Sequence, residues 1–302
     1  MSHSLDNRTI LVTGGGRGLG RAYAQLVAEC GAHVVVSDID AETASSVAEE
    51  LCSTGLRADA VVCDVSAPED VERLVHRTLE LSGRLDGVVN NAGIQAIDDI
   101  ADVDLATARQ LIDVNLLGTV NVTHHAIPVM RSLGAGSIVN VTSGAQCGMR
   151  AMSVYGATKG GIASFTYSVA LDCAGTAIRV NAISPLADTQ MAVMSDDYRR
   201  QRDLPAGTRR RPSPEQCAAA VVYLLSDASR ALNGQVIRID SDGISLMSHP
   251  ARIDASIVHA VAPDPDDVAA AIEGHMLSHL VPVGNHAGVV AQLGAGQDGA
   301  RK

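Results

Sequence analysis

Short runs of β-branched and other apolar residues alternate with longer helical patterns from Thr9 to Ile239. Strands that alternate with helices predict a parallel sheet, because each parallel connection has to cross back over the sheet. Several strand segments are apolar throughout, which is typical of strands that helices cover on both faces. The sequence therefore predicts an α/β fold with a doubly wound parallel sheet. The predicted strands are Ile10–Thr13, His33–Ser37, Ala60–Cys63, Leu85–Val89, Ser137–Val141, Ile178–Ile183 and Val236–Ile239.

One helix start carries a recognisable pattern. Ser66 precedes Pro68 and Glu69, an arrangement that combines a capping residue, a proline in the first turn and a capping-box acid. The pattern predicts a helix that Ser66 caps.

A glycine-rich segment, Thr13–Gly20, follows the first predicted strand directly and opens a helical pattern. Glycine lets the backbone approach a pyrophosphate closely, and a helix N-terminus presents free N–H groups and a partial positive charge. The glycines have the spacing G-x-x-x-G-x-G, not the commoner G-x-G-x-x-G. A simple turn is the alternative, but the position between the first strand and the first helix favours cofactor binding. Contacts are predicted from Gly14, Arg17, Gly18, Leu19 and Gly20.

Asp38 ends the second predicted strand, close to the position where an acid binds the adenosine ribose in dinucleotide-binding folds. A carboxylate there repels a 2′-phosphate, so Asp38 favours NAD over NADP. Arg17 acts in the opposite direction, because a guanidinium pairs well with a phosphate. Repulsion in a confined site outweighs the attraction of a mobile arginine, and NAD is the predicted cofactor.

Tyr155 and Lys159 are four residues apart in the segment Ser153–Ala174, which has a helical pattern, so their side chains share one face. A free tyrosine has a pKa of about 10, and lowering it toward 7 takes about 4 kcal/mol. A lysine ammonium one turn away and an oxidised nicotinamide ring both favour the phenolate. Alone, the pair is weak evidence, since any amphipathic helix can carry a surface tyrosine and lysine at this spacing.

The composition argues against several classes of protein. Of 302 residues, 46% are hydrophobic and 19% are charged, and no stretch approaches the roughly twenty apolar residues of a membrane span. The segment Met1–Ile10 lacks the apolar stretch of a secretory signal, which indicates a cytoplasmic protein. A net charge of -11, a single phenylalanine and the absence of tryptophan argue against a nucleic-acid partner.

No metal site is predicted. The six cysteines are scattered without a C-x-x-C pair, which argues against zinc and against a disulfide framework in a chain of this length. His275 and His279 are four residues apart, but no acid lies between them, so the metalloprotease pattern is absent. Packed or solvated histidines are the expectation at these positions.

The tyrosine and lysine belong to a longer series of motifs: Thr13–Gly20, Asp64–Val65, Asn90–Gly93, Asn115, Ser143, Tyr155, Lys159 and Asn181–Pro185. With these motifs in this order, the stretch from about Thr9 to Gly243 resembles the short-chain dehydrogenase/reductase family. The resemblance implies a three-layer Rossmann-type sandwich with seven parallel strands. It also implies hydride transfer between NAD(H) and a small secondary alcohol or ketone, in a tetramer or dimer.

Roles for single residues follow from the resemblance. Tyr155 would be the general acid/base, and Lys159 would lower its pKa and hold the nicotinamide ribose. Ser143 would bind the substrate oxygen, and Asn115, in a helix over Asp113–Thr119, would anchor a water between Lys159 and solvent. For the cofactor, the resemblance implies contacts from Asp64, Val65, Asn91, Ala92 and Gly93. The alternatives are that Asp64 caps a turn and that Asn90 and Asn91 form a loop without a ligand.

Two departures from the family pattern concern the substrate side. Ser143 lies twelve residues before Tyr155, one fewer than the commonest family spacing, which predicts a shortened loop. After Pro185 the family usually has glycine and then a threonine five positions past the proline. Here Leu186 follows, and Thr189 is four positions past. Thr189 is expected to hold the nicotinamide carboxamide despite this apparent deletion.

Two other functions remain open at this point. Some relatives of the family bind NAD without turnover, but such proteins often lose the tyrosine or the lysine, and this chain has both. The other alternative is an enzyme of 3-oxoacyl or 3-hydroxyacyl thioesters, because arginines gather after Thr189, where an anion-binding lid could lie. A solvated face is the competing interpretation of these arginines. They are Arg199, Arg200, Arg202, Arg209, Arg210 and Arg211.

The chain is expected to divide into a catalytic domain, residues 1–248, and a C-terminal extension, residues 249–302. Asp264–Asp267 predicts the start of an amphipathic helix that docks on its own or a neighbouring subunit, whereas Gln292–Lys302 predicts disorder. From the family resemblance, the helices near Asp104–Met130 and Ser153–Ala174 are expected to pair across a two-fold axis.

Overall fold

A computed structural model describes residues 4–203 and 210–250 of this chain. The chain divides into two units, Met1–Met247 and Ser248–Lys302. The predicted helix after Asp264–Asp267 and the predicted disordered end both lie outside the described residues.

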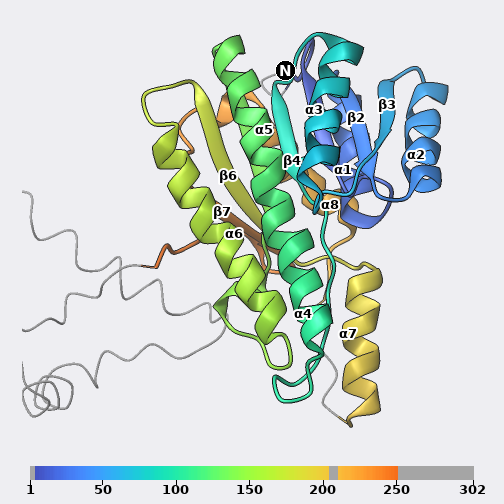
Figure 1. Cartoon of the computed structure of the whole chain (residues 1–302), viewed down its shortest axis with the longest axis vertical. Helices are drawn as coiled ribbons and strands as arrows, with labels where there is room; N and C mark the ends of the chain where they lie inside the picture. The colour runs from blue at the N-terminus through green and yellow to red at the C-terminus, as the bar shows by residue number, and fades with distance from the viewer. Residues whose placement is uncertain (1–3, 204–209, 251–302) are drawn as a thin grey trace, which may run out of the picture. The chain divides into compact units, whose positions relative to one another are not determined.

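The core of the fold is an eight-stranded sheet with the strand order β3-β2-β1-β4-β5-β6-β7-β8 (Figure 1). The first seven strands are parallel, and β8 runs antiparallel to β7. The order reverses between β1 and β4, and ligands of such sheets bind at this point, beyond the carboxyl ends of the strands. The strands are β1 Thr9–Thr13, β2 His33–Asp38, β3 Arg57–Val62, β4 Gly87–Asn90, β5 Gly136–Val141, β6 Ile178–Pro185, β7 Val236–Asp240 and β8 Gly243–Met247.

Helices cover both faces of the sheet, which confirms the three-layer Rossmann-type sandwich. In β1, Ile10 and Val12 pack into one buried cluster with α1, α2 and α8, whereas Leu11 packs into another with α3, α5 and α6. Figure 1 shows the second group in front of the sheet. The helices are α1 Gly18–Glu29, α2 Ala41–Ser53, α3 Pro68–Ser82, α4 Leu105–Leu111, α5 Gly118–Leu133, α6 Ser153–Asp172, α7 Gln190–Gln201 and α8 Pro214–Leu225.

Several predicted boundaries were wrong. β3 begins at Arg57, before the predicted Ala60, because it lies at the edge of the sheet, where half-exposed polar residues are tolerated. The antiparallel β8 was not predicted. Its residues are largely exposed, so the buried apolar pattern of the other strands is missing.

The prediction that Ser66 caps a helix was also wrong. The N-cap of α3 is Ala67, with Pro68 in the first turn. The Ser66 hydroxyl instead donates to Asp64 Oδ1 at 2.7 Å.

The expected helix over Asp113–Thr119 is present, but it is not a regular α-helix. A π-helical turn, Ile112–Leu117, joins α4 to α5. Turns of this kind are rare and are found frequently at functional sites. Asn115 lies in this turn and is completely buried.

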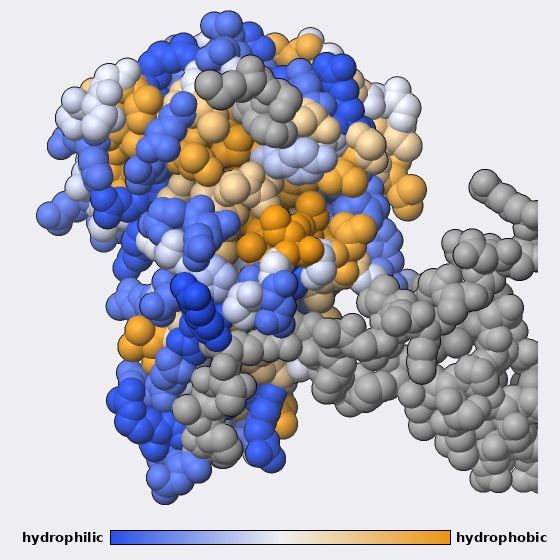
Figure 2. All heavy atoms as spheres, turned by 180° about the vertical axis from the view of Figure 1, so that it is seen from behind, coloured by the Kyte–Doolittle hydropathy of each residue, from blue (hydrophilic) through white to orange (hydrophobic). Residues whose placement is uncertain are grey.

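No helix within residues 4–203 and 210–250 is long and apolar enough to cross a membrane. Figure 2 shows the face opposite to that of Figure 1, where apolar side chains reach the surface between hydrophilic ones.

Candidate active site

Tyr155 and Lys159 lie on the buried face of α6, as their spacing predicted. The exposed fractions are 8% for Tyr155 and 4% for Lys159. Lys159 Nζ lies 5.7 Å from the centroid of the Tyr155 ring, and it donates a hydrogen bond to the carbonyl of Val141 at 2.9 Å. Because Val141 ends β5, the lysine joins the helix to the carboxyl end of the central sheet.

Burial acts on both titratable groups. It lowers the pKa of Lys159 to about 8 and raises the pKa of Tyr155. Ser143 acts in the opposite direction on Tyr155 and lowers its pKa in part. A buried phenol is therefore a poor base in the protein alone. A phenolate here needs nearby positive charge, which the Lys159 ammonium and a bound oxidised nicotinamide would both supply.

Ser143 follows β5 and reaches Tyr155 although the loop between them is short. Ser143 lies close enough to Tyr155 to act on its pKa, and Ser143 Oγ accepts a hydrogen bond from the Ala145 N–H at 3.2 Å. Ala151 in this loop has a φ of 60°, a conformation that is uncommon for a residue other than glycine. Its carbonyl accepts the Asp98 N–H at 2.9 Å, so the short loop contacts the segment that follows β4.

Asn115 fixes the backbone beside the lysine. Its Oδ1 accepts the Ile94 N–H at 2.8 Å, and its Nδ2 donates to the Ile94 carbonyl at 2.9 Å and to Thr158 Oγ1 at 3.2 Å. A Cβ on Gly93 would lie 3.0 Å from Asn115 Oδ1 and 3.6 Å from Lys159 Nζ. Both donors of the amide are used within the protein, so the side chain positions the loop after β4 next to Lys159.

The glycine-rich segment packs tightly against the end of β4. Gly14 has a φ of 60°, and a Cβ on it would lie 2.8 Å from the Cα of Ala92. A Cβ on Gly20 would clash with the carbonyl oxygen of Gly14. Asn91 Nδ2 donates to the carbonyls of Thr13 at 3.0 Å and Gly14 at 2.9 Å. Glycine is therefore required at both positions for the backbone to take this course.

The N-terminus of α1 is open to an anion. Arg17 is the N-cap, its side chain makes no capping hydrogen bond, and the first turn holds no acidic residue. A Cβ on Gly18 would meet no atom within 4 Å, so the backbone is accessible there. Free N–H groups and the helix dipole suit a phosphate. This end of the sheet therefore fits the pyrophosphate of a dinucleotide.

Asp38 is 6% exposed at the end of β2, beside this segment. Its Oδ2 accepts the Gly16 N–H at 3.0 Å, and its Oδ1 accepts the Asp40 N–H at 3.2 Å. The two bonds hold the carboxylate against the glycine-rich segment, where the sequence predicted the adenosine ribose.

Other residues expected at the cofactor also make contacts within the protein. Asp64 Oδ1 accepts the Ser66 N–H at 2.9 Å, so this carboxylate does cap a turn. The carbonyl of Val65 accepts a hydrogen bond from Asn121 Nδ2 at 3.0 Å. Thr189 is the half-buried N-cap of α7 and makes no side-chain capping bond.

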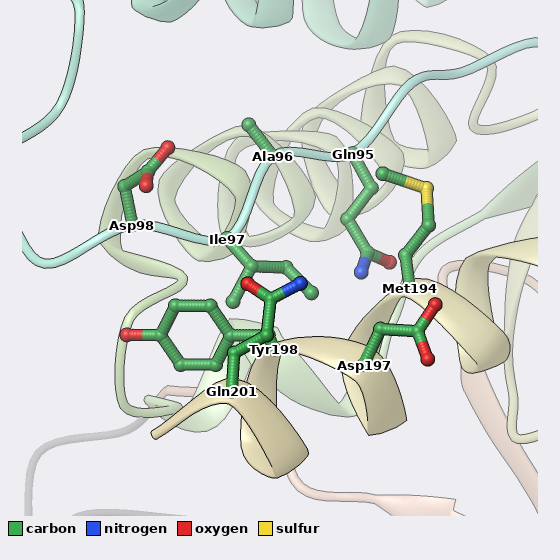
Figure 3. A pocket seen from close by; sticks show the side chains of 8 residues that line it. All are labelled: Gln95, Ala96, Ile97, Asp98, Met194, Asp197, Tyr198 and Gln201. Atoms are coloured by element: carbon green, nitrogen blue, oxygen red, sulfur yellow. The ribbon is translucent and has the colours of Figure 1, made fainter.

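A pocket of about 380 Å³ lies between the loop after β4 and α7 (Figure 3). Gln95 Nε2 joins the two walls, because it donates to Ser195 Oγ at 3.2 Å and to the Met191 carbonyl at 3.4 Å. No motif of the sequence indicated these residues, and only the position of the loop after Gly93 could have drawn attention to them. The pocket is lined by Gln95, Ala96, Ile97, Asp98, Met194, Asp197, Tyr198 and Gln201.

With this arrangement established, known proteins provide the identification. Residues 14–243 match a family model described as "Enoyl-(Acyl carrier protein) reductase". A crystal structure of a short chain dehydrogenase from Mycobacterium avium superposes with a TM-score of 0.80 at 29% identity, covering 92% of this chain and 97% of that one. The chain belongs to the short-chain dehydrogenase/reductase family.

Curated members of the family include several enzymes of cyclic alcohols. The cis-4-hydroxycyclohexanecarboxylate dehydrogenase of Sinomonas cyclohexanicum is 38% identical over 245 residues, or 80% of this chain and 98% of that protein. The cyclohexanol dehydrogenase of Acinetobacter sp. (strain SE19) is 33% identical, over 80% of this chain and 96% of that protein. This short-chain dehydrogenase/reductase is accordingly an oxidoreductase that acts on CH–OH groups.

A third relative is named for a 3-oxoacyl substrate carried on an acyl carrier protein. The 3-oxoacyl-(acyl-carrier-protein) reductase FabG of Thermotoga maritima is 34% identical, over 78% of this chain and 97% of that protein. Both substrate classes considered from the sequence therefore occur among the relatives of this family member.

Several of the arginines after Thr189 make contacts within the protein. Arg211 forms two hydrogen bonds with the carboxylate of Asp196, at 2.6 and 2.7 Å. Arg200 pairs with Asp197 at 3.0 Å, and the guanidinium of Arg202 lies 4.2 Å from the centroid of the Tyr198 ring. Arg209 lies outside the described residues. These contacts agree better with a charge-balanced helix than with a cluster of arginines aimed at an anion.

Proposed function

We propose that this short-chain dehydrogenase/reductase oxidises secondary alicyclic alcohols to ketones with NAD, using Tyr155 as the base. The observation that carries the proposal is the buried pair of Tyr155 and Lys159 with the half-buried Ser143 beside it. A phenol beside a serine hydroxyl, with its ring centroid 5.7 Å from an ammonium, can exchange a proton with a substrate oxygen. The cyclic-alcohol names of the relatives support the substrate class.

In this proposal each residue of the cluster has one task. Ser143 donates to the substrate oxygen, on which negative charge grows as the hydroxyl proton leaves. Tyr155 takes that proton while the Lys159 ammonium stabilises the phenolate. Asn115 holds Ile94 and Gly93 in place beside Lys159 and acts as a positioning residue. The nicotinamide, when bound, supplies the acceptor for the hydride from the carbinol carbon.

The glycine-rich segment supports the cofactor assignment. Gly14 and Gly20 leave no room for a side chain, and no side chain caps the free N–H groups at the start of α1. Gly14, Arg17, Gly18, Leu19 and Gly20 would hold the pyrophosphate. The other proposed cofactor contacts are Asp38, Asp64, Val65, Asn91, Ala92, Gly93, Tyr155, Lys159 and Thr189. Asp38 supports NAD over NADP, since a buried carboxylate beside Gly16 would oppose a 2′-phosphate.

The decisive experiment follows NADH formation with a panel of secondary cyclic alcohols. Tyr155→Phe should lower turnover by orders of magnitude while the affinity for NAD stays within a few-fold, because the change removes the proton route and little else. The wild-type enzyme should also have a lower KM for NAD than for NADP. Near-normal turnover by Tyr155→Phe would exclude the proposed base, and a preference for NADP would overturn the role of Asp38.

Reduction of 3-oxoacyl thioesters is the second candidate, and the relative from Thermotoga maritima favours it. The arginine contacts described above weigh against it. Oxidation of NADH or NADPH with acetoacetyl-CoA, faster than any alcohol oxidation, would make it the better assignment. Non-catalytic NAD binding has no comparable support, since the curated relatives are named as dehydrogenases and reductases.

We also propose that the enzyme is a homo-oligomer in which α4, α5 and α6 contact a second subunit. Large apolar side chains are exposed on these helices, and a second subunit would cover them. The exposed fractions reach 80% for Leu105 and 76% for Leu171, and Leu133 adds to the same set. Light scattering at micromolar concentration should give a dimer or tetramer, and a monomer would refute the proposal.

A further inference from the structure

The pocket beside α7 adjoins the proposed reaction centre. Ala96 and Ile97 from its wall pack in one apolar cluster with Tyr155 and Met152. On the opposite wall, Met194 and Tyr198 add further apolar surface from α7. A substrate bound to Tyr155 would therefore extend along a wall that favours a hydrocarbon ring.

The charged residues in the described lining of the pocket are all acidic. Asp98 lies in one wall and Asp197 in the other, and no lysine or arginine of residues 4–203 and 210–250 lines the pocket. Asp197 is paired with Arg200 at 3.0 Å. The carboxylate of the half-buried Asp98, in contrast, makes no hydrogen bond or ion pair with the parts of the chain that the structure describes.

Asp98 lies at the end of the loop that starts at the reaction centre. Ile94 is bonded to Asn115 beside Lys159, and Asp98 follows four residues later, at most about 14 Å away in an extended chain. The Asp98 N–H bonds to the Ala151 carbonyl, which fixes the backbone there. Figure 3 shows the Asp98 carboxylate on the same side of the loop as the Ala96 side chain, directed away from α7 and from the side chains of Tyr198 and Asp197.

No lysine or arginine within residues 4–203 and 210–250 forms an ion pair with Asp98. Arg150 precedes Ala151 in the facing loop, but it is exposed and forms no ion pair with Asp98. The Arg202 guanidinium is stacked on the Tyr198 ring. A ligand that supplies a donor would form a charge-assisted hydrogen bond with this carboxylate, which no side chain of the described residues occupies.

We propose that Asp98 selects alicyclic alcohols that carry a second hydrogen-bond donor, a hydroxyl or an ammonium, remote from the reacting carbinol, and that it excludes carboxylates. The inference rests on the proposed function and names its substrate class. It separates this enzyme from its relative of 38% identity, which is named for a substrate with a carboxylate. Asp98 acts on substrate binding, so its effect appears in KM.

The test compares four probes: cyclohexanol, 1,4-cyclohexanediol, 4-aminocyclohexanol and 4-hydroxycyclohexanecarboxylate. The wild-type enzyme should have its lowest KM for the diol or the amino alcohol and its highest for the carboxylate. In Asp98→Asn the KM for the carboxylate should fall about tenfold and the KM for the amino alcohol should rise by a similar factor, with cyclohexanol unchanged. The neutral diol separates the hydrogen bond from the charge, because its KM depends on a hydrogen bond to residue 98 and not on the charge of that residue.

Asp99→Asn is the matched control. It removes the same charge one residue along the chain, but Asp99 is exposed and does not line the pocket. The control should leave all four KM values within about twofold of wild type. Equal effects of the two substitutions would show a general surface charge and would refute the selection by Asp98.

Failure of this inference can be separated from failure of the proposed function. If cyclic alcohols are oxidised but the carboxylate is the best substrate, only the selection by Asp98 is wrong. If no probe is oxidised, the proposed function fails, and calorimetry with NADH-loaded enzyme then tests Asp98 by binding alone. Cyclohexylamine should bind at least tenfold more tightly than cyclohexanecarboxylate, and Asp98→Asn should remove the difference. Equal binding of the two would overturn the inference.

Discussion

Replacing Lys159 by methionine should shift the pH dependence of alcohol oxidation to higher pH. Methionine keeps the length of the buried chain but removes the ammonium, which lies 5.7 Å from the centre of the Tyr155 ring. Two unit charges at that distance interact by about 3 kcal/mol at an effective dielectric constant of about 20. Loss of this attraction would raise the pKa of Tyr155 by about 2, because 1.36 kcal/mol corresponds to one pKa unit.

The sign of the effect follows from the role of Tyr155. Oxidation needs the phenolate, so the rate rises with pH until the tyrosine is deprotonated. At pH 7 the variant should be about 100-fold slower than wild type, and the deficit should narrow as the pH approaches 10. The assay measures kcat at saturating NAD and alcohol between pH 6 and pH 10, which removes any loss of cofactor affinity from the comparison.

Two variants control this experiment. Lys159→Arg keeps a positive charge and should keep the wild-type pH profile better than Lys159→Met, even if its rate is lower. Tyr155→Phe has no phenol and should show no recovery at any pH. A deficit of Lys159→Met that stays constant from pH 6 to pH 10 would refute the electrostatic argument and leave the lysine only a binding role.

Three further predictions concern stability and cofactor binding. The pKa of Lys159 is lowered to about 8 in the folded protein, so between pH 8 and pH 10.5 the folded state has lost this proton while the unfolded state still holds it. The free energy of unfolding should therefore rise with pH by about 3 kcal/mol over that range through Lys159. Urea unfolding of wild type and Lys159→Met at pH 7.5 and pH 10 measures it, and a pH dependence shared by both proteins would contradict the assignment. Gly20→Ala should weaken NADH binding at least tenfold in a fluorescence titration, since its Cβ clashes with the Gly14 carbonyl, and wild-type affinity would show that the segment can rearrange without cost. Removal of residues 249–302 should lower the thermal unfolding midpoint or change the oligomeric mass, as expected for a docked amphipathic helix, and no change in stability, assembly or activity would exclude docking.

The sheet and its flanking helices were predictable because their signals are local. A strand that is buried on both faces is apolar at most positions, as at Ile10, Leu11 and Val12 of β1, and a buried helix repeats its apolar face every three or four residues. The exposed β8 and the polar β3 lack this signal, and both were placed wrongly or missed. At Ser66 the capping pattern was matched, but the hydroxyl bonds to Asp64 instead of capping the helix.

Part of the site could also be predicted, because motif residues are close in sequence or fall at the ends of strands. The four-residue spacing of Tyr155 and Lys159 is enough to place both on one face of a helix. Whether the shortened loop still brings Ser143 to Tyr155 depends on the fold and not on spacing, and Ser143 does lie close enough to the tyrosine to act on its pKa. Burial decides the pKa of Lys159, and burial depends on the packing of β5 against α6.

The sequence by itself determined the fold class, because the fold class depends on periodicity. The order of its motifs carried the resemblance that gave the family and the catalytic candidates. Only the tertiary structure decided which groups meet across long separations. Gln95 and Ser195 are a hundred residues apart, yet their hydrogen bond joins the walls of the pocket. The role proposed for Asp98 likewise depends on tertiary structure, because only the fold brings this loop residue into the lining of a pocket whose described charged residues are all acidic. Contacts between distant segments form where the chain packs, and that packing minimises the free energy of the whole sheet and its helices rather than of any segment alone.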